Sequence, residues 1–237
     1  NNEVWRILGV FPTDDGTGKI ENRIKLIRDQ SIGNKYWNTT QATPTSNYNN
    51  WAGATLQTEL NTTYLTGLTS EAQSMIGNAK YYLGGYNGMV SGQGYTQTSV
   101  QMYSYERKIK NTTSNEFYYG TNPNSWTGKL ALMYESDYGY ASSNCENKML
   151  YSVNSETDDL RACKSTNWLY NLKSNEWTLP QLANSWYDAF RVHLNGLVDS
   201  GSVTSYQHAA RPVLYLTSST KITGGSGTSS SPYTLGL

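Results

Sequence analysis

Residues 175–216 read NEWTLPQLANSWYDAFRVHLNGLVDSGSVTSYQHAARPVLYL, and the fold is predicted mainly from this C-terminal stretch. Its apolar residues are spaced as a framework between Trp, Tyr, Arg, His, Asn and Asp side chains, and both histidines of the protein lie within it. Alternation at residues 190–193, followed by Asn195-Gly196, predicts a β-hairpin with a type I′ turn. We therefore expect antiparallel strands that display polar and aromatic side chains. The predicted framework residues are Trp177, Phe190, Val192, Leu197, Val198, Val203 and residues 213–216.

The composition favours one domain with wet, aromatic surfaces. The chain has 237 residues, a length that a mostly β domain commonly reaches by itself. It has 20 Tyr and 7 Trp beside only 3 Phe, so most of its large apolar side chains carry a polar group suited to interfaces. Lys and Arg balance Asp and Glu at 18 each, which argues against the basic surface of a nucleic-acid-binding protein.

The sequence also indicates the compartment. No apolar run approaches the roughly 20 residues that cross a bilayer, so we expect no membrane insertion by this chain. It opens directly on strand-like sequence, from which we expect that an upstream signal or anchor was removed. Cys145 and Cys163 are the two cysteines, and an even pair predicts one disulfide in an oxidising, extracellular environment. The alternatives are two reduced, buried thiols or a metal site, which two thiols alone cannot complete.

Several further elements are predicted from local patterns. Residues 4–11 and 23–28 predict a β-hairpin across the turn-rich residues 12–19, and residues 55–60 predict a short helix. A longer helix is predicted at residues 70–83, with a capping box formed by Ser70 and Gln73. The remaining predictions are a strand within residues 95–110, an apolar strand at 126–134, and an edge strand after the Gly/Ser-rich residues 223–231.

The catalytic motifs that a sequence can reveal are missing. There is no Gly-x-Ser-x-Gly elbow, no His-Glu-x-x-His zinc pair and no Gly-rich phosphate loop before a helix. His193 and His208 fall on expected strand and loop positions, where surface histidines are common. We therefore expect no enzyme activity, no cofactor and no metal.

Several stretches resemble an uncharacterised secreted domain of Gram-positive bacteria and their phages, whose members often carry an upstream prepilin-like or signal segment. The stretches are WRILGVF at 5–11, WTGKLALMYESDYGYA at 126–141, the two cysteines, RPVLYL at 211–216 and ITGGSGTSSSPY at 222–233. The ending resembles the close of a C-type-lectin-like or formylglycine-generating-enzyme-like fold. The resemblance implies one α+β domain over residues 1–237, with a twisted, mainly antiparallel sheet, about two helices and long loops.

The same resemblance implies where a ligand would bind. In the variable proteins of diversity-generating retroelements, which share this fold, changeable side chains lie just before the final core strand, here residues 181–208. Cys145 and Cys163 do not match the active site of the formylglycine-generating enzymes, so that activity is not carried over. The Glu-Pro-Asn and Gln-Pro-Asp calcium triplets of sugar-binding C-type lectins are also missing.

We therefore predict an extracellular, non-enzymatic domain that binds a protein or glycan on a cell surface. Trp186 could instead be a core residue, and Arg191 and Asp199 could be ordinary polar residues on the solvated face of a strand. Burial of both Trp186 and Tyr187 would rule out this binding surface. The alternative functions are a pilin-like or phage tail subunit, and a polysaccharide-acting enzyme. The predicted ligand-binding residues are Gln181, Asn184, Trp186, Tyr187, Arg191, His193, Asp199, Tyr206 and His208.

Overall fold

The N-terminal hairpin forms one edge of the first sheet, as the sequence predicts. β1 (Trp5–Asp14) and β2 (Ile20–Arg28) pair antiparallel along their whole length. β1 extends beyond the predicted residue 11 and includes Pro12, which an edge strand tolerates because only one of its sides needs hydrogen bonds. The computed structural model describes residues 3–39, 47–87, 97–151, 158–170 and 174–237.

The centre of the first sheet is β12 (Val213–Leu216). Its four residues are all buried, which explains the continuous apolar run there. It pairs antiparallel with β2 on one side, and on the other with two short strands, β4 (Ile76–Gly77) and β7 (Leu130–Ala131). The last residues of the C-terminal stretch are therefore the core strand that the sequence predicts.

The second sheet contains the rest of the C-terminal stretch, in the order β10-β9-β8-β11-β3. All its pairs are antiparallel except the short parallel contact of β11 with β8. Every framework residue predicted between positions 177 and 216 is buried. The strands are β3 (Asn34–Tyr36), β8 (Glu176–Gln181), β9 (Asp188–Val192), β10 (Val198–Ser202) and β11 (Gln207–Ala209).

The predicted hairpin at Asn195-Gly196 is confirmed, but its turn type is wrong. A type I′ turn needs positive φ at both central residues, whereas here Gly196 has φ of 86° and Asn195 is not among the positive-φ residues. His193 and Leu197 close the loop through the amide of His193, at 2.8 Å from the carbonyl of Leu197. The loop thus has three residues, and Gly196 alone takes the left-handed conformation.

A helical stretch covers the first sheet. The helix predicted at residues 55–60 is confirmed and is longer, because a π-helical segment continues it. Leu56 and Leu60 are buried on its inner face beside Trp51. The segments are η1 (Trp51–Gly53), α1 (Thr55–Glu59), η2 (Leu60–Tyr64) and α2 (Leu65–Gly67).

The predicted helix at residues 70–83 is mostly wrong. α3 (Ser70–Met75) ends after six residues, and the chain then enters β4 and β5 (Ala79–Tyr82). Burial in β5 alternates, with Ala79 and Tyr81 inside, so the apolar residues that fitted a helix also fit a strand. The cap is Thr69, whose side chain accepts from the amide of Ala72, in place of the predicted capping box.

The strand predicted within residues 95–110 is also wrong. Residues 95 and 96 lie outside the described residues, and α4 (Ser99–Glu106) occupies most of the rest. Its N-terminus is capped by Thr98 and Gln101, and its buried residues Ser99, Met102 and Glu106 follow helical spacing. Two of these three buried residues are polar, so the pattern of apolar residues does not mark the buried face of this helix.

Three short helices pack beside α4, and a disulfide joins two of them. Cys145 and Cys163 form the predicted bond, and both are fully buried. Only part of the predicted strand at 126–134 forms, as β7 and as β6 (Ser125–Gly128), which pairs with β5. The helices are α5 (Glu135–Tyr140), α6 (Ser143–Glu146) and α7 (Asp158–Thr166).

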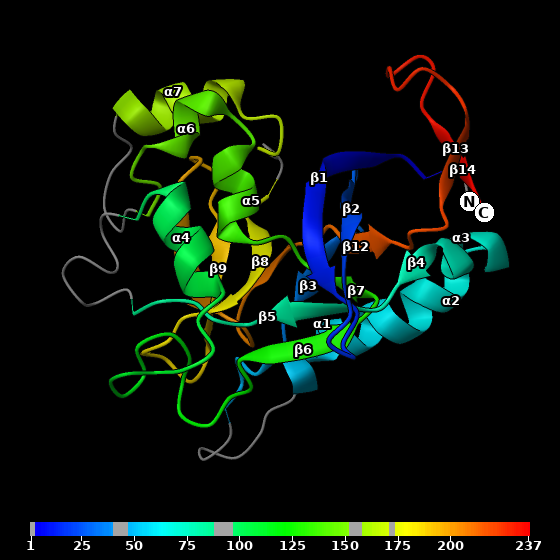
Figure 1. Ribbon diagram of the computed structural model, residues 1–237. Coiled ribbons are helices and arrows are strands. Elements are labelled where there is room, and N and C mark those ends of the chain that lie inside the picture. Colours follow the sequence, from blue (N-terminus) through cyan, green and yellow to red (C-terminus); the bar gives the residue numbers. More distant parts are fainter. Residues whose placement is uncertain (1–2, 40–46, 88–96, 152–157, 171–173) are drawn as a thin grey trace.

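The elements gather around two apolar cores. One core joins the first sheet to the helical stretch at residues 51–67, and the other packs α4 to α7 against β9 and β10. Figure 1 shows α4, α5, α6 and α7 gathered beside β8 and β9, with the β1–β2 hairpin across from them. The fold class is therefore α+β, with mostly antiparallel, open sheets and short helices.

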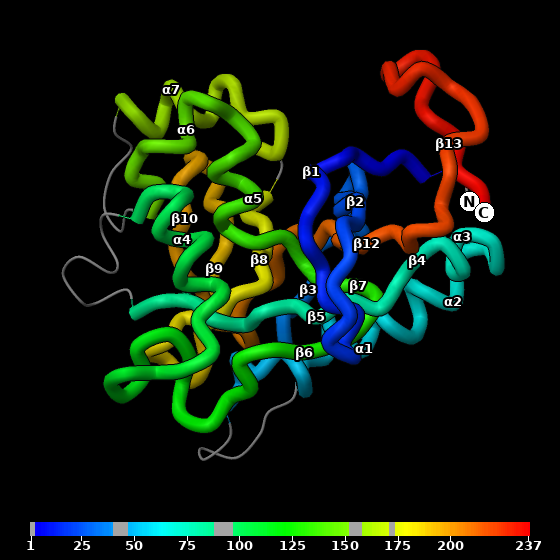
Figure 2. The backbone as a smooth tube through the Cα atoms, in the orientation of Figure 1, coloured from blue at the N-terminus to red at the C-terminus, as the bar shows by residue number. Residues whose placement is uncertain are grey.

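The C-terminal segment forms a hairpin of its own. β13 (Lys221–Gly224) pairs antiparallel with β14 (Thr234–Gly236). β14 is the edge strand that the sequence predicts after residues 223–231. Figure 2 shows this red segment projecting beyond the body of the protein. Among the described residues, no helix is long and apolar enough to span a bilayer.

Candidate binding surface

The register of the second sheet brings Arg191 between two partners. On β9, Arg191 lies opposite Trp177 of β8 and opposite Asp199 of β10. Directly opposed residues project from the same face of a sheet, so these three side chains are neighbours. Phe190 and Val192, which alternate with Arg191, face the helices and belong to the second core. One face of β9 is thus structural, and the other presents Arg191.

Arg191 is held by three hydrogen bonds. Its Nε lies 2.6 Å from Oδ1 of Asp199 and its Nη2 lies 3.2 Å from Oδ2, a bidentate ion pair. Its Nη1 lies 2.7 Å from Nε2 of His208. A guanidinium can only donate, so His208 accepts on Nε2 and its neutral ring carries the proton on Nδ1. The position of Gly201 leaves room for this arrangement, because a Cβ there would lie 3.1 Å from Nη1 of Arg191.

Burial keeps His208 uncharged at neutral pH. It lowers the pKa of His208 to about 4, and the positive charge of Arg191 acts in the same direction. His208 is 5% exposed, and its ring lies between two others: it is tilted by 46° against Trp177 and stacked on Tyr206. His208 is therefore a fixed acceptor for Arg191 and has no free nitrogen with which to take a proton from a substrate.

Three neighbouring rings lead from the core to the surface. The centroid of the buried Trp177 ring lies 4.4 Å from that of His208, and the Tyr206 ring lies 5.9 Å beyond at an interplanar angle of 10°. Trp177 is anchored in turn by its Nε1, 2.8 Å from the carbonyl of Lys35. Tyr206 is 52% exposed, with the Arg191 guanidinium carbon 5.6 Å from its centroid. The outer tyrosine ring is thus oriented by buried neighbours.

A buried chain of amides positions the loop before β9. Asn49 is fully buried, and its Nδ2 lies 3.2, 2.7 and 2.9 Å from the carbonyl oxygens of Leu182, Ser185 and Asp188. Nδ2 of Asn122 donates to Oδ1 of Asn49 at 3.0 Å and to Oε1 of Gln181 at 2.7 Å. These contacts fix residues 182–188 from the inside.

That loop presents two aromatic side chains. Tyr187 is 41% exposed, and Trp186 is half-buried, with its ring 4.9 Å from Tyr187 and 5.1 Å from Tyr48. The burial of both residues, which would have ruled out the predicted surface, is not observed. Tyr187 precedes Arg191 by four positions, roughly 13 Å along an extended chain. The rings of the loop and the contacts of Arg191 therefore follow one another along the same segment of chain.

The structure divides the nine predicted ligand-binding residues by exposure. Tyr187 and Tyr206 are exposed, and five others are half-buried. Gln181 and His208 are buried at 2% and 5% exposure, so neither can contact a ligand at the surface; both instead support side chains or loops that can. The half-buried residues are Asn184, Trp186, Arg191, His193 and Asp199.

His193 and Asn184 stand apart from the Arg191 contacts. His193 lies at the β9–β10 hairpin, where its Nδ1 is 2.9 Å from Oδ1 of Asn195. Asn184 lies in the loop before β9, and its Oδ1 is buried with no hydrogen-bond partner in the described part of the chain. Sequence reasoning did not find Asn49, Asn122 or Tyr48, because they contact the loop from distant positions and no local pattern marks them.

Searches of protein-family profiles, of curated proteins and of solved structures each find no match. Among the described residues, no group of three or more His, Cys, Asp or Glu side chains could hold a metal ion. The geometry of this surface is therefore the basis for inferring a function. We define the display surface as Trp186, Tyr187, Arg191, Asp199 and Tyr206.

Proposed function

We propose that this protein is an extracellular, non-enzymatic domain that binds a protein or glycan on a cell surface through the display surface. The observation that carries the proposal is the row of neighbouring rings Trp177, His208 and Tyr206, with Arg191 held beside it by Asp199 and His208. Oriented Tyr, Trp and Arg side chains lose little conformational entropy on binding, and they dominate the energetics of many interfaces.

Two further features support the proposal. The disulfide between Cys145 and Cys163 suits an oxidising environment outside the cell. His208 is held by Arg191 through its Nε2 and is kept neutral by burial, so it is not free as a general base. The α+β fold, in which the buried strand β12 follows the display surface, is compatible with a C-type-lectin-like domain, and we keep that finer assignment as part of the proposal.

A binding array tests this function. The isolated domain is applied to arrays of glycans and host-surface proteins, next to the double variant Tyr187→Ala/Tyr206→Ala. We expect the wild type to bind a defined subset and the variant to lose it, because both substitutions remove exposed rings without emptying the core. If the variant keeps the wild-type pattern, the display surface is not the binding site.

The gene tests whether the surface is diversified. We expect a near-copy of the codons for residues 181–208 close by, next to a reverse transcriptase and differing at adenines. The buried contacts of Gln181 and His208 add a constraint, because variation there would break the support of the surface. Differences should therefore spare these two codons and concentrate on exposed ones such as Tyr187 and Tyr206. Without such a copy, the surface is an ordinary, fixed binding site.

One observation favours a second candidate, the pilin-like or phage tail subunit. The edge strand β1 exposes Val4 beside it and Val10 within it at 53% and 61%, and Ile20 of β2 is 67% exposed. Exposed apolar edges usually mark contacts with another chain. Sedimentation of the purified domain with Val10→Lys as a control tests this. Assembly that the Lys variant abolishes would support a structural subunit, and a concentration-independent monomer would oppose it.

A further inference from the structure

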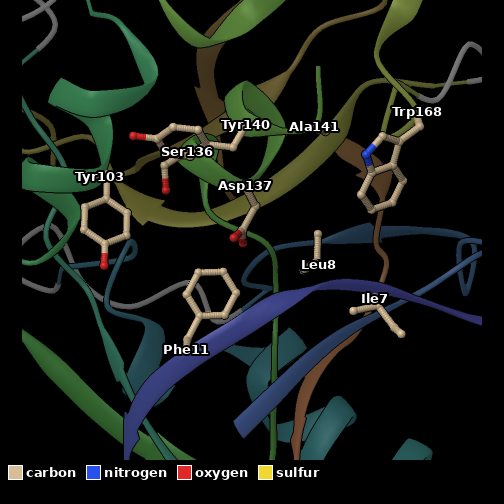
Figure 3. A pocket seen from close by; sticks show the side chains of 9 residues that line it. All are labelled: Ile7, Leu8, Phe11, Tyr103, Ser136, Asp137, Tyr140, Ala141 and Trp168. Atoms are coloured by element: carbon tan, nitrogen blue, oxygen red, sulfur yellow. The ribbon is translucent and has the colours of Figure 1, made fainter. Parts of the chain in front are cut away.

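A cavity of about 430 Å³ lies between β1 and the helices of the second core, and it shares no residue with the display surface. Its volume falls in the range of roughly 300–1,000 Å³ typical of small-molecule sites. Figure 3 shows Asp137 near the centre, with side chains of β1 below it and Tyr103 and Trp168 on opposite sides. The lining residues are Ile7, Leu8, Phe11, Tyr103, Ser136, Asp137, Tyr140, Ala141 and Trp168.

The floor of the cavity offers a buried acceptor. Asp137 is 9% exposed, and its Oδ2 accepts from Nζ of Lys25 at 2.5 Å and from the amide of Tyr134 at 2.8 Å. Its other oxygen, Oδ1, takes part in none of the hydrogen bonds found among the described residues. Oδ1 is not among the fully buried, unpaired side-chain atoms of the described residues, so it is accessible to a further donor from the cavity. A ligand that donates a hydrogen bond here would satisfy it.

The charge of this floor is already balanced. Lys25 is fully buried, paired with Asp137, and surrounded by the rings of Tyr134, Phe11 and Tyr215 at 4.5, 5.5 and 5.8 Å. A cationic ligand would have to compete with Lys25 for the carboxylate. An anionic ligand would meet the carboxylate itself. The cavity therefore favours a neutral donor.

The rim of the cavity is aromatic. Tyr103, Tyr140 and Trp168 are 38%, 45% and 39% exposed, an unusual concentration of accessible rings. Arginines lie over two of these rings: Arg107 is 3.4 Å from the Tyr103 centroid and Arg6 is 5.9 Å from the Trp168 ring. These cations occupy ring faces that a cationic ligand would need, and they help to orient the rings.

We propose that this cavity binds a neutral saccharide, whose hydroxyl groups donate to Asp137 and whose apolar face stacks on Trp168. A sugar ring combines both properties, because its hydroxyls project at the edge while C–H groups cover a face. A purely apolar ligand would leave Oδ1 of Asp137 unsatisfied. The cavity is separate from the display surface, so a failure of this proposal would leave the proposed function unaffected, and the reverse also holds.

Saturation-transfer NMR with the full chain tests the proposal. The probes are glucose, galactose, mannose, rhamnose, N-acetylglucosamine and maltose at millimolar concentration, with choline and benzoate as charged controls. We expect at least one sugar to show transfer and to shift the methyl resonances of Ile7 and Leu8, while choline and benzoate give none. The proposal is overturned if no sugar in the panel binds, or if a charged probe binds in place of the sugars.

Rim variants locate the binding. Trp168→Ala and Tyr140→Ala remove partly exposed rings, so the fold should persist, and each should weaken binding by about tenfold. Tyr233→Ala is the matched control, because Tyr233 is 43% exposed on the distant C-terminal hairpin. Sugar binding that survives both rim substitutions, or that Tyr233→Ala weakens equally, would overturn the assignment. Asp137 is left intact in this test because its loss would leave Lys25 unpaired in the core.

Discussion

At the residue scale, the display surface depends on polar groups that are themselves buried. Arg191 reaches the surface, but its orientation comes from Asp199 beside it and His208 behind it. The cross-strand pair of Arg191 and Asp199 depends on the three-residue loop of the hairpin, because the predicted two-residue turn at Asn195-Gly196 would place Ser200 opposite Arg191. The role of His208 could not be predicted, because it arises only when folding places its ring between those of Trp177 and Tyr206.

His208 should make stability depend on pH. Its pKa is about 4 in the folded protein, below its usual value near 6.5, so the unfolded chain binds the proton more readily. This contribution to stability is complete above pH 6.5 and is lost as the pH falls toward 4, at up to roughly 1.4 kcal/mol per pH unit. Thermal melts of the wild type and of His208→Gln, which can still accept from Arg191, measure it.

The comparison with His208→Gln isolates the histidine from other titrating groups. Burial raises the pKa of Glu135 and Glu176, which shifts stability in the opposite direction in both proteins. We expect the wild type to lose more stability than the variant between pH 7 and pH 5. Parallel losses in the two proteins would contradict the assigned protonation of His208.

Asn49 should be among the most sensitive polar residues. Asn49→Ala leaves the carbonyl groups of the loop before β9 without their donor, at a cost of about 3 kcal/mol if one to two of them stay unpaired. Urea denaturation gives the change in unfolding free energy. Asn147→Ala, at an exposed position, is the control and should change it by less than about 0.5 kcal/mol. Equal effects of the two substitutions would refute the role given to Asn49.

At the element scale, local pairing is what the sequence predicts well. The β1–β2 and β9–β10 hairpins form as expected, because each needs only alternation and a turn. The predicted helix at 70–83 fails because the alternating burial of Ala79 and Tyr81 fits a strand, and tertiary pairing with β12 and β6 selects the strands. α4 is missed because polar Ser99 and Glu106 face the core.

The disulfide should stabilise the second core. It joins α6 to α7 across a sequence separation of 18, for which the chain-entropy model gives about 3 kcal/mol. We expect the double variant Cys145→Ala/Cys163→Ala to lose about this much unfolding free energy, and thiol reduction to destabilise only the wild type. Hydrogen exchange should show the loss first in α6 and α7. A reducing agent that leaves the wild-type melting temperature unchanged would contradict this.

At the scale of the whole molecule, two cores support two separate surfaces. The C-terminal stretch supplies strands to both sheets, so its exposed rings are carried on the most connected part of the fold. The cavity beside Asp137, by contrast, collects residues from β1, α4, α5 and the segment after α7. The sequence could indicate the first surface because it lies in one stretch. It could not indicate the second, because only folding brings those residues together.

Binding of a partner by the oriented rings of the display surface is best tested by comparing two exposed tyrosines. Binding to the glycan and protein array is quantified for the wild type and for two single variants, Tyr206→Ala and Tyr233→Ala. Both tyrosines are exposed, at 52% and 43%, but only Tyr206 is backed by His208 and Arg191. We expect Tyr206→Ala to lose most of the bound signal while Tyr233→Ala keeps it; equal signals from the two variants would show that the display surface does not bind the partner.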